Sequence, residues 1–203
     1  LYSSAASDVY KRQPYIQKIF REHISMSERV LAEQAAVINA MANVLIDCYK
    51  GGHKAIFCGN GGSAADSQHL AAEFVGRYLI DRRPLPALAL HTDTSTLTAI
   101  GNDYGYDQVF SRQVHAHIQP GDVLICLTTS GNSRNVVCAA EAAREQGNLV
   151  LGLLGNSGGA VLPLCDHALV VPCPQAYLVQ EISMLVGHLL CDLMEQALFS
   201  DAR

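Results

Sequence analysis

Short, almost uninterrupted apolar segments alternate with longer amphipathic segments through most of this chain. The first two apolar segments are KAIFCGN, from Lys54, and PALALHT, from Pro86, and stretches with helical spacing follow them. Strands that are apolar on both faces are typical of parallel sheets covered by helices on both sides. The pattern therefore predicts an α/β fold, a three-layer sandwich around a central, mostly parallel sheet of about five strands.

The order of these segments predicts one domain over residues 14–203, which is an ordinary size for a single core. A long helix is expected first, ended by Gly51 and Gly52. The predicted strands are 54–60, 86–92, 122–131, 148–156 and 167–173. The predicted helices are 25–50, 63–78 with Ser63 as N-cap, 95–100 and 109–118 around the loop GNDYGYD, 133–146 and 176–199.

The first thirteen residues, LYSSAASDVYKRQ, do not share this pattern. They lack an initiator Met and a clear core pattern, and DVYKRQ resembles the translation of an adaptor used in sequencing libraries. We interpret residues 1–13 as a non-native extension and leave them out of the fold prediction. The alternative is a genuine disordered tail.

Composition excludes several classes of protein. The net charge of −5 gives no basic surface for nucleic acid or an anionic membrane. No apolar run approaches the roughly 20 residues of a membrane span, and no signal peptide is visible. The seven cysteines include no C-x-x-C pair, which favours reduced, buried thiols in a cytoplasmic protein.

Two predicted strands end in loops of similar chemistry. The first is Asn60-Gly61-Gly62-Ser63, and the second is Thr128-Thr129-Ser130-Gly131-Asn132-Ser133. Each loop opens a helix, so each offers free backbone N–H groups and the positive end of a helix dipole. Such residues are also ordinary turn and cap residues. Neither loop continues as G-K-[ST] or G-x-G-x-x-G, so the expected ligand is a phosphorylated small molecule and not a nucleotide.

Ionisable residues lie on the helices beside these loops. His69 and Glu73 are four residues apart and share a helix face, while Gln180 and His188 lie eight apart on the last helix. If both helices line one cleft, these four residues form a possible metal site, and two imidazoles with one carboxylate suit zinc. Solvent-exposed side chains with no such role remain the alternative, and these residues alone specify no reaction.

Four longer motifs carry a family resemblance. They are CGNGGSAADSQHLAAEFVGRY, LTAIGNDYGYDQVFSRQV, TTSGNSRNV and VQEISMLVGH, and the similarity extends over about residues 20–199. Together they resemble the sugar isomerase (SIS) domain family, whose fold is flavodoxin-like. Within it they are most similar to the phosphoheptose isomerases, which convert D-sedoheptulose 7-phosphate to D-glycero-D-manno-heptose 7-phosphate, a lipopolysaccharide heptose precursor.

The resemblance implies a role for each matching residue. Glu73 and His188 are expected to be the catalytic pair, and zinc is the expected cofactor. The family is usually a cytoplasmic homotetramer whose active sites are shared between subunits and whose N-terminal helices pack in the assembly. The implied metal ligands are His69, Glu73, Gln180 and His188, and the implied substrate contacts are Asn60, Gly61, Gly62, Ser63, Glu73, Asn102, Asp103, Thr128, Thr129, Ser130, Ser133 and Gln180.

The chain departs from the family pattern at three positions, and two other functions are open. Ser183 stands where a His is frequent, Leu178 where an Arg is common, and Thr128 where a Ser is usual. One alternative is a non-catalytic SIS-domain protein that binds the bacterial replication initiator, which LPALALHTD and CDLMEQALF resemble; that relative lacks the acid–base pair. The other is a sugar-phosphate sensor, although residues 14–50 show no helix-turn-helix.

Overall fold

A computed structural model describes residues 2–200 of the chain, with side chains from Arg12 onward. It contains two compact units, Leu1–Ala35 and Ala36–Arg203, and helix α1 (Tyr2–Lys50) has residues in both. The helix predicted for 25–50 is therefore longer than expected. Residue 1 and the side chains of residues 2–11 of the suspected extension lie outside the described part, so its origin stays a prediction.

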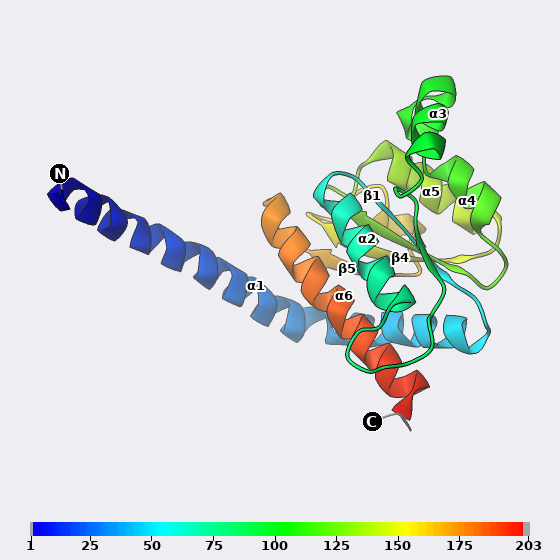
Figure 1. The fold of residues 1–203 in the computed structure, drawn as a ribbon, viewed down its shortest axis with the longest axis horizontal. Helices are drawn as coiled ribbons and strands as arrows, with labels where there is room; N and C mark the ends of the chain where they lie inside the picture. Colours follow the sequence, from blue (N-terminus) through cyan, green and yellow to red (C-terminus); the bar gives the residue numbers. More distant parts are fainter. Residues whose placement is uncertain (1, 201–203) are drawn as a thin grey trace. The chain divides into compact units, whose positions relative to one another are not determined.

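The second unit contains a five-stranded sheet, as the alternating pattern predicts (Figure 1). All neighbouring strands are parallel, in the order β2-β1-β3-β4-β5. The order reverses between β1 and β3, and in such sheets ligands bind where the strands end near this reversal. The strands are β1 (Ala55–Gly59), β2 (Ala87–Ala89), β3 (Val123–Thr128), β4 (Leu149–Gly155) and β5 (His167–Val171).

Helices cover both faces of this sheet. α2 (Gly62–Val75) and α6 (Ala176–Leu198) run side by side on one face, and α4 (Ser111–His117) and α5 (Arg134–Glu145) pack together on the other (Figure 1). Successive residues of one strand alternate between the two cores. Phe57 packs toward Phe74 of α2, whereas Ile56 belongs to the core formed with α4 and α5. The three-layer prediction is confirmed.

Several boundaries differ from the predictions. Helix α2 begins at Gly62, and its N-cap is Gly61 at φ 58°, not Ser63. Helix α3 (Thr94–Tyr104) is longer than predicted and includes half of the expected loop, and the short helix η1 (Tyr106–Gln108) follows it. A second short helix, η2 (Leu162–Leu164), precedes β5. The two predicted helical pieces around the GNDYGYD loop are thus three elements.

Two expectations from composition have different outcomes. All seven cysteines are free thiols and six are buried, as predicted. The statement that no apolar run approaches a membrane span is wrong for two helices, because Arg12–Lys50 and α6 are long and apolar enough by length and composition. Half of the α6 window is buried inside the protein, as in the core helix of a soluble domain.

Candidate active site

Three of the four predicted metal ligands come together between α2 and α6. The Nε2 atoms of His69 and His188 are 2.9 Å apart, and His69 Nε2 is 3.3 Å from Glu73 Oε1. One ligand atom from each residue lies within 4.8 Å of the other two. The His69 side chain is 49% exposed and that of Glu73 23%, so the cluster opens to solvent on this chain. Residues 119 positions apart in sequence therefore form one cluster that could hold a metal ion.

Close packing of the two helices explains how this cluster forms. His69 and Glu73 are one turn apart on α2, and His188 faces them from α6. A Cβ atom added at Gly187 would lie only 2.7 Å from Leu70 Cδ2. Since a larger residue would push the helices apart, Gly187 allows the approach that brings the imidazoles into contact.

Hydroxyl groups gather at the end of β3, where the second loop opens α5. Thr128 Oγ1 is 3.2 Å from Ser133 Oγ and 3.5 Å from Ser130 Oγ. The backbone N–H of Gly131, at φ 70°, donates to Thr128 Oγ1 over 3.2 Å. The loop thus sets three hydroxyls beside the N-terminal N–H groups of α5, an arrangement suited to a phosphoryl group.

Side-chain amides join the first loop to helix α5, which follows the second loop. Asn60 Nδ2 donates to Asn135 Oδ1 over 2.8 Å, and Asn135 Nδ2 donates back to Asn60 Oδ1 over 2.9 Å. The Tyr106 hydroxyl also donates to Asn60 Oδ1, at 3.0 Å. Asn135 is buried on α5. The first loop is therefore hydrogen-bonded to the first turn of α5, the helix that the second loop opens.

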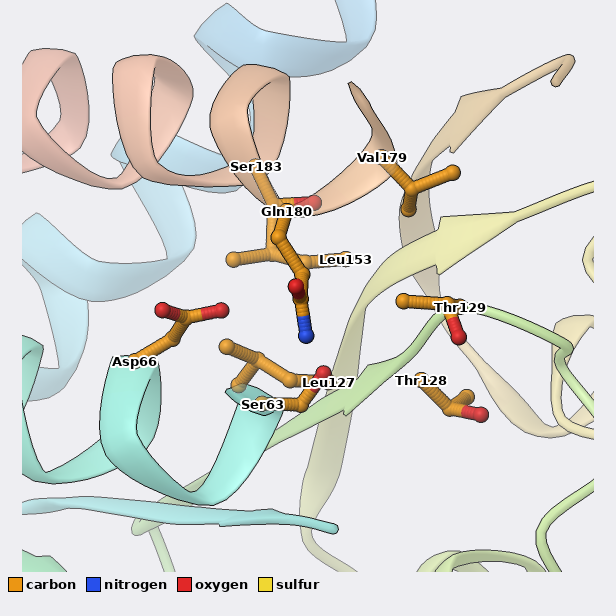
Figure 2. Close-up of a pocket in the computed structure, with 9 residues that line it drawn as sticks. All are labelled: Ser63, Asp66, Leu127, Thr128, Thr129, Leu153, Val179, Gln180 and Ser183. Atoms are coloured by element: carbon orange, nitrogen blue, oxygen red, sulfur yellow. The ribbon is translucent and has the colours of Figure 1, made fainter. Parts of the chain in front are cut away.

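A small pocket is lined by residues of α2 and α6, by strands β3 and β4, and by Thr128 and Thr129 where the second loop begins (Figure 2). Gln180 projects from α6 toward the first loop, where a Cβ added at Gly62 would lie 2.2 Å from Gln180 Nε2. Across the pocket, Asp66 Oδ2 is buried and has no hydrogen-bond partner among the described residues. Burial raises the pKa of the Asp66 carboxyl, and His69 opposes this. The lining residues are Ser63, Asp66, Leu127, Thr128, Thr129, Leu153, Val179, Gln180 and Ser183.

Asn102 and Asp103 lie on α3, which has no buried residue among its eleven. Both are exposed, and Asn102 Nδ2 donates to Asp103 Oδ1 over 2.8 Å. Tyr106, which follows them in η1, donates a hydrogen bond to Asn60 of the first loop. Their predicted contact with substrate stays a prediction.

Comparisons with known proteins agree with this geometry. The SIS domain family profile matches residues 18–155. The phosphoheptose isomerase of Rhodospirillum rubrum is 56% identical over 170 residues, which are 84% of this chain and 90% of the relative. The chain belongs to the phosphoheptose isomerases of the SIS domain family.

Solved structures of other phosphoheptose isomerases share the fold. The protein from Neisseria gonorrhoeae superposes with a TM-score of 0.86 at 41% identity, over 91% of this chain and 98% of that protein. The one from Francisella tularensis gives 0.87 at 35% identity, with the same two coverages. The architecture of this family member is therefore that of the phosphoheptose isomerases.

Several residues near the site were not predicted from sequence. Asp66 lies three residues before His69 on α2, a spacing that would have placed it on the same face. Asn135 and Tyr78 had no comparable signal, because their partners are distant in sequence. The two departures on α6, Leu178 and Ser183, are both buried. Ser183 lines the same pocket as Asp66 (Figure 2).

Proposed function

We propose that this member of the phosphoheptose isomerases interconverts D-sedoheptulose 7-phosphate and D-glycero-D-manno-heptose 7-phosphate through an enediol, with Glu73 and His188 as the acid–base pair. The observation that carries the proposal is the contact of His69, Glu73 and His188 in one partly exposed cluster, in a fold whose strands β1 and β3 end in loops suited to an anion. The family's reaction needs a base and an acid near two adjacent carbons, and this cluster supplies both.

The proton transfers can be assigned to the two residues. The Glu73 carboxylate removes a proton from C1 of the ketose while His188 donates a proton to the oxygen on C2, which produces the enediol. Glu73 then returns its proton to C2, and His188 takes the proton from the oxygen on C1. The result is the aldose, with both side chains back in their starting states.

The phosphate end of the sugar would bind at the second loop. Thr128, Ser130 and Ser133 offer hydroxyl donors, and the first turn of α5 offers backbone N–H groups. Neutral donors can hold a dianion without a basic cluster, which is consistent with a chain of net charge −5. Asn60, Gly61, Gly62, Ser63 and Thr129 at the same edge, with Asn102, Asp103 and Gln180, complete the proposed set of substrate contacts.

The cluster also fits a divalent metal ion, for which we propose zinc. Two imidazoles and one carboxylate are a known catalytic zinc set, with a further position left open. His69, Glu73 and His188 would hold the ion, with the Gln180 amide as the proposed fourth ligand. Bound zinc would supply Lewis acidity toward the sugar oxygens.

We also propose that the active form is a cytoplasmic homotetramer with shared sites. Leu185 and Leu189, which flank His188 on α6, are 52% and 41% exposed on the single chain. Exposed apolar side chains around a functional cluster are typical of surfaces that another subunit covers.

Replacement of Glu73 by Gln tests the catalytic assignment. The amide cannot accept the C1 proton, so we expect kcat to fall by about 10²–10⁴-fold while sugar-phosphate binding is retained. Turnover should be followed as aldose formation, and binding by calorimetry. Glu145→Gln, at an exposed position at the end of α5, is the matched control and should keep full activity. Normal turnover by Glu73→Gln would refute the assignment.

The substrate and metal are tested with the purified protein. Aldose formation from sedoheptulose 7-phosphate should stop after chelation and return with added Zn²⁺. If no product forms with Zn²⁺ present and the protein instead captures purified replication initiator protein, the non-catalytic alternative is correct. If product forms equally well after chelation, zinc is not required, and only the metal part of the proposal is contradicted.

A further inference from the structure

The segment that follows α2 is folded around one buried carboxylate. Glu195 of α6 is 0% exposed and accepts hydrogen bonds from the backbone N–H groups of Tyr78, Leu79 and Ile80 at 2.9, 2.9 and 3.1 Å. Arg82 Nε donates to the same carboxylate over 2.9 Å. A buried charge persists only where it is paired and hydrogen-bonded, and here every bond comes from residues 78–82.

Arg82 also completes the end of α2. Its Nη2 donates to the carbonyl oxygen of Glu73 over 2.8 Å, and its Nη1 donates to that of Phe74 over 2.9 Å. The last carbonyls of a helix have no N–H partners within the helix, so a guanidinium there satisfies them and suits the helix dipole. Arg82 thereby connects Glu195 to the turn of α2 that carries Glu73.

This segment, residues 78–82, places Tyr78 against the cluster of His69, Glu73 and His188. The rings of Tyr78 and His188 are stacked, with centroids 5.6 Å apart and planes inclined by 14°. The ring of His69 meets His188 edge-on, with a centroid separation of 5.1 Å and an interplanar angle of 74°. His188 is therefore in contact with one aromatic ring from the segment and another from α2.

We propose that Tyr78 is a positioning residue for His188, and that the Arg82–Glu195 pair holds Tyr78 in place. The proposal rests on the metal site proposed above. The phenol ring keeps the His188 imidazole turned toward His69 and Glu73, so that the three ligand atoms are arranged before an ion binds. Groups that orient ligands in this way typically contribute about 10–100-fold to metal affinity.

Two substitutions at Tyr78 separate positioning from folding. Tyr78→Phe keeps the stacked ring, whereas Tyr78→Leu removes it. Neither substitution alters the backbone N–H of residue 78, which donates a hydrogen bond to Glu195. We expect Tyr78→Leu to weaken Zn²⁺ binding by about 10–100-fold in a competition titration with a chelating dye. Tyr78→Phe should bind within about threefold of the wild type, a change well below that range. The visible spectrum of bound Co²⁺ should change in Tyr78→Leu alone.

The outcomes distinguish this proposal from the metal site on which it rests. A wild-type protein that binds neither Zn²⁺ nor Co²⁺ would overturn both. A wild type that binds Zn²⁺, with Tyr78→Leu equal to it in affinity and Co²⁺ spectrum, would overturn only the positioning role. Loss of affinity in both variants would overturn it as well, because the hydroxyl and not the ring would then be required. Thermal unfolding of each variant reports whether it is folded.

Discussion

Asn135 is a buried amide that is hydrogen-bonded to one of the loops proposed to bind substrate. Its side chain exchanges two hydrogen bonds with Asn60 in the first loop, and its own helix begins at the second loop. Removal of a buried partner leaves the remaining polar groups unsatisfied, at a cost of about 1–3 kcal/mol. For Asn135→Ala we therefore expect the KM for sugar phosphate to rise by about 5–100-fold with a smaller change in kcat.

A double-mutant cycle checks that Asn135 acts through Asn60. If it does, Asn60→Ala combined with Asn135→Ala should raise KM no further than the more damaging single variant. Additive effects would mean that the two residues contribute independently, which contradicts the loop-joining role. KM should be measured on protein confirmed as folded by circular dichroism.

The sequence predicts the residues of the site better than the contacts between them. The spacing of His69 and Glu73 determines that they share a helix face, so their 3.3 Å contact follows from local geometry. His188 is 119 residues from His69, and only the family resemblance linked them in advance. Neither helix spacing nor the family resemblance linked Asn60 to Asn135, because their amides meet only when β1 and β3 are paired.

At the level of elements, the end of α2 is stabilised by a tertiary contact. The apolar pattern continues to Tyr78, yet the helix ends at Val75 with Gly76 as its C-cap. Arg82 satisfies the carbonyls of Glu73 and Phe74, and Glu195 accepts hydrogen bonds from the segment that follows. Helix α3 shows the opposite case. Asp93 caps it by accepting from the Thr96 N–H over 2.9 Å, and Gly105 at φ 87° ends it, so two local signals define it without any buried residue.

The Arg82–Glu195 pair should make stability depend on pH. Burial alone would raise the pKa of the Glu195 carboxyl, but three backbone N–H bonds and Arg82 outweigh it and lower the pKa below its ordinary 4.5. A lowered folded-state pKa contributes stability that is complete above pH 4.5 and is lost as pH falls through the folded value. We expect Tm to fall more steeply below pH 4.5 in the wild type than in Glu195→Gln.

Replacement of Arg82, the cation of this pair, tests the same contact at neutral pH. Arg82→Lys keeps the charge but cannot bond Glu195 and the α2 carbonyls together, and disruption of a buried pair costs about 3–5 kcal/mol. The expected loss of unfolding free energy is toward the lower end of that range, measured by urea denaturation. Arg83→Lys is the matched control, since Arg83 lies over the Phe199 ring and makes no documented bond to Glu195. Equal stability of the two variants would contradict the role of Arg82.

At the scale of the whole molecule, the cluster of His69, Glu73 and His188 lies on a surface whose neighbours are apolar. Leu185 and Leu189 follow one side of α6, and Val75 near the end of α2 is 47% exposed. The first unit carries exposed apolar side chains of its own, at Tyr15, Ile16, Phe20, Ile24 and Leu31. Sequence periodicity identifies apolar faces but not the chain that covers them, so the proposed assembly rests on the family resemblance.

Negative charge placed at Leu185 and Leu189, on the exposed side of α6, should both separate the proposed subunits and reduce turnover. In the double variant Leu185→Glu, Leu189→Glu, two carboxylates would be buried at the proposed contact without partners, at a cost that a subunit interface does not tolerate. Light scattering after gel filtration should then report a smaller assembly than the wild type, with kcat/KM reduced by at least about tenfold because the shared sites are lost. Leu149→Glu is the matched control, because Leu149 is a similarly exposed leucine, 43% exposed, on another element, at the start of β4. An unchanged assembly in the double variant would show that α6 does not form the interface.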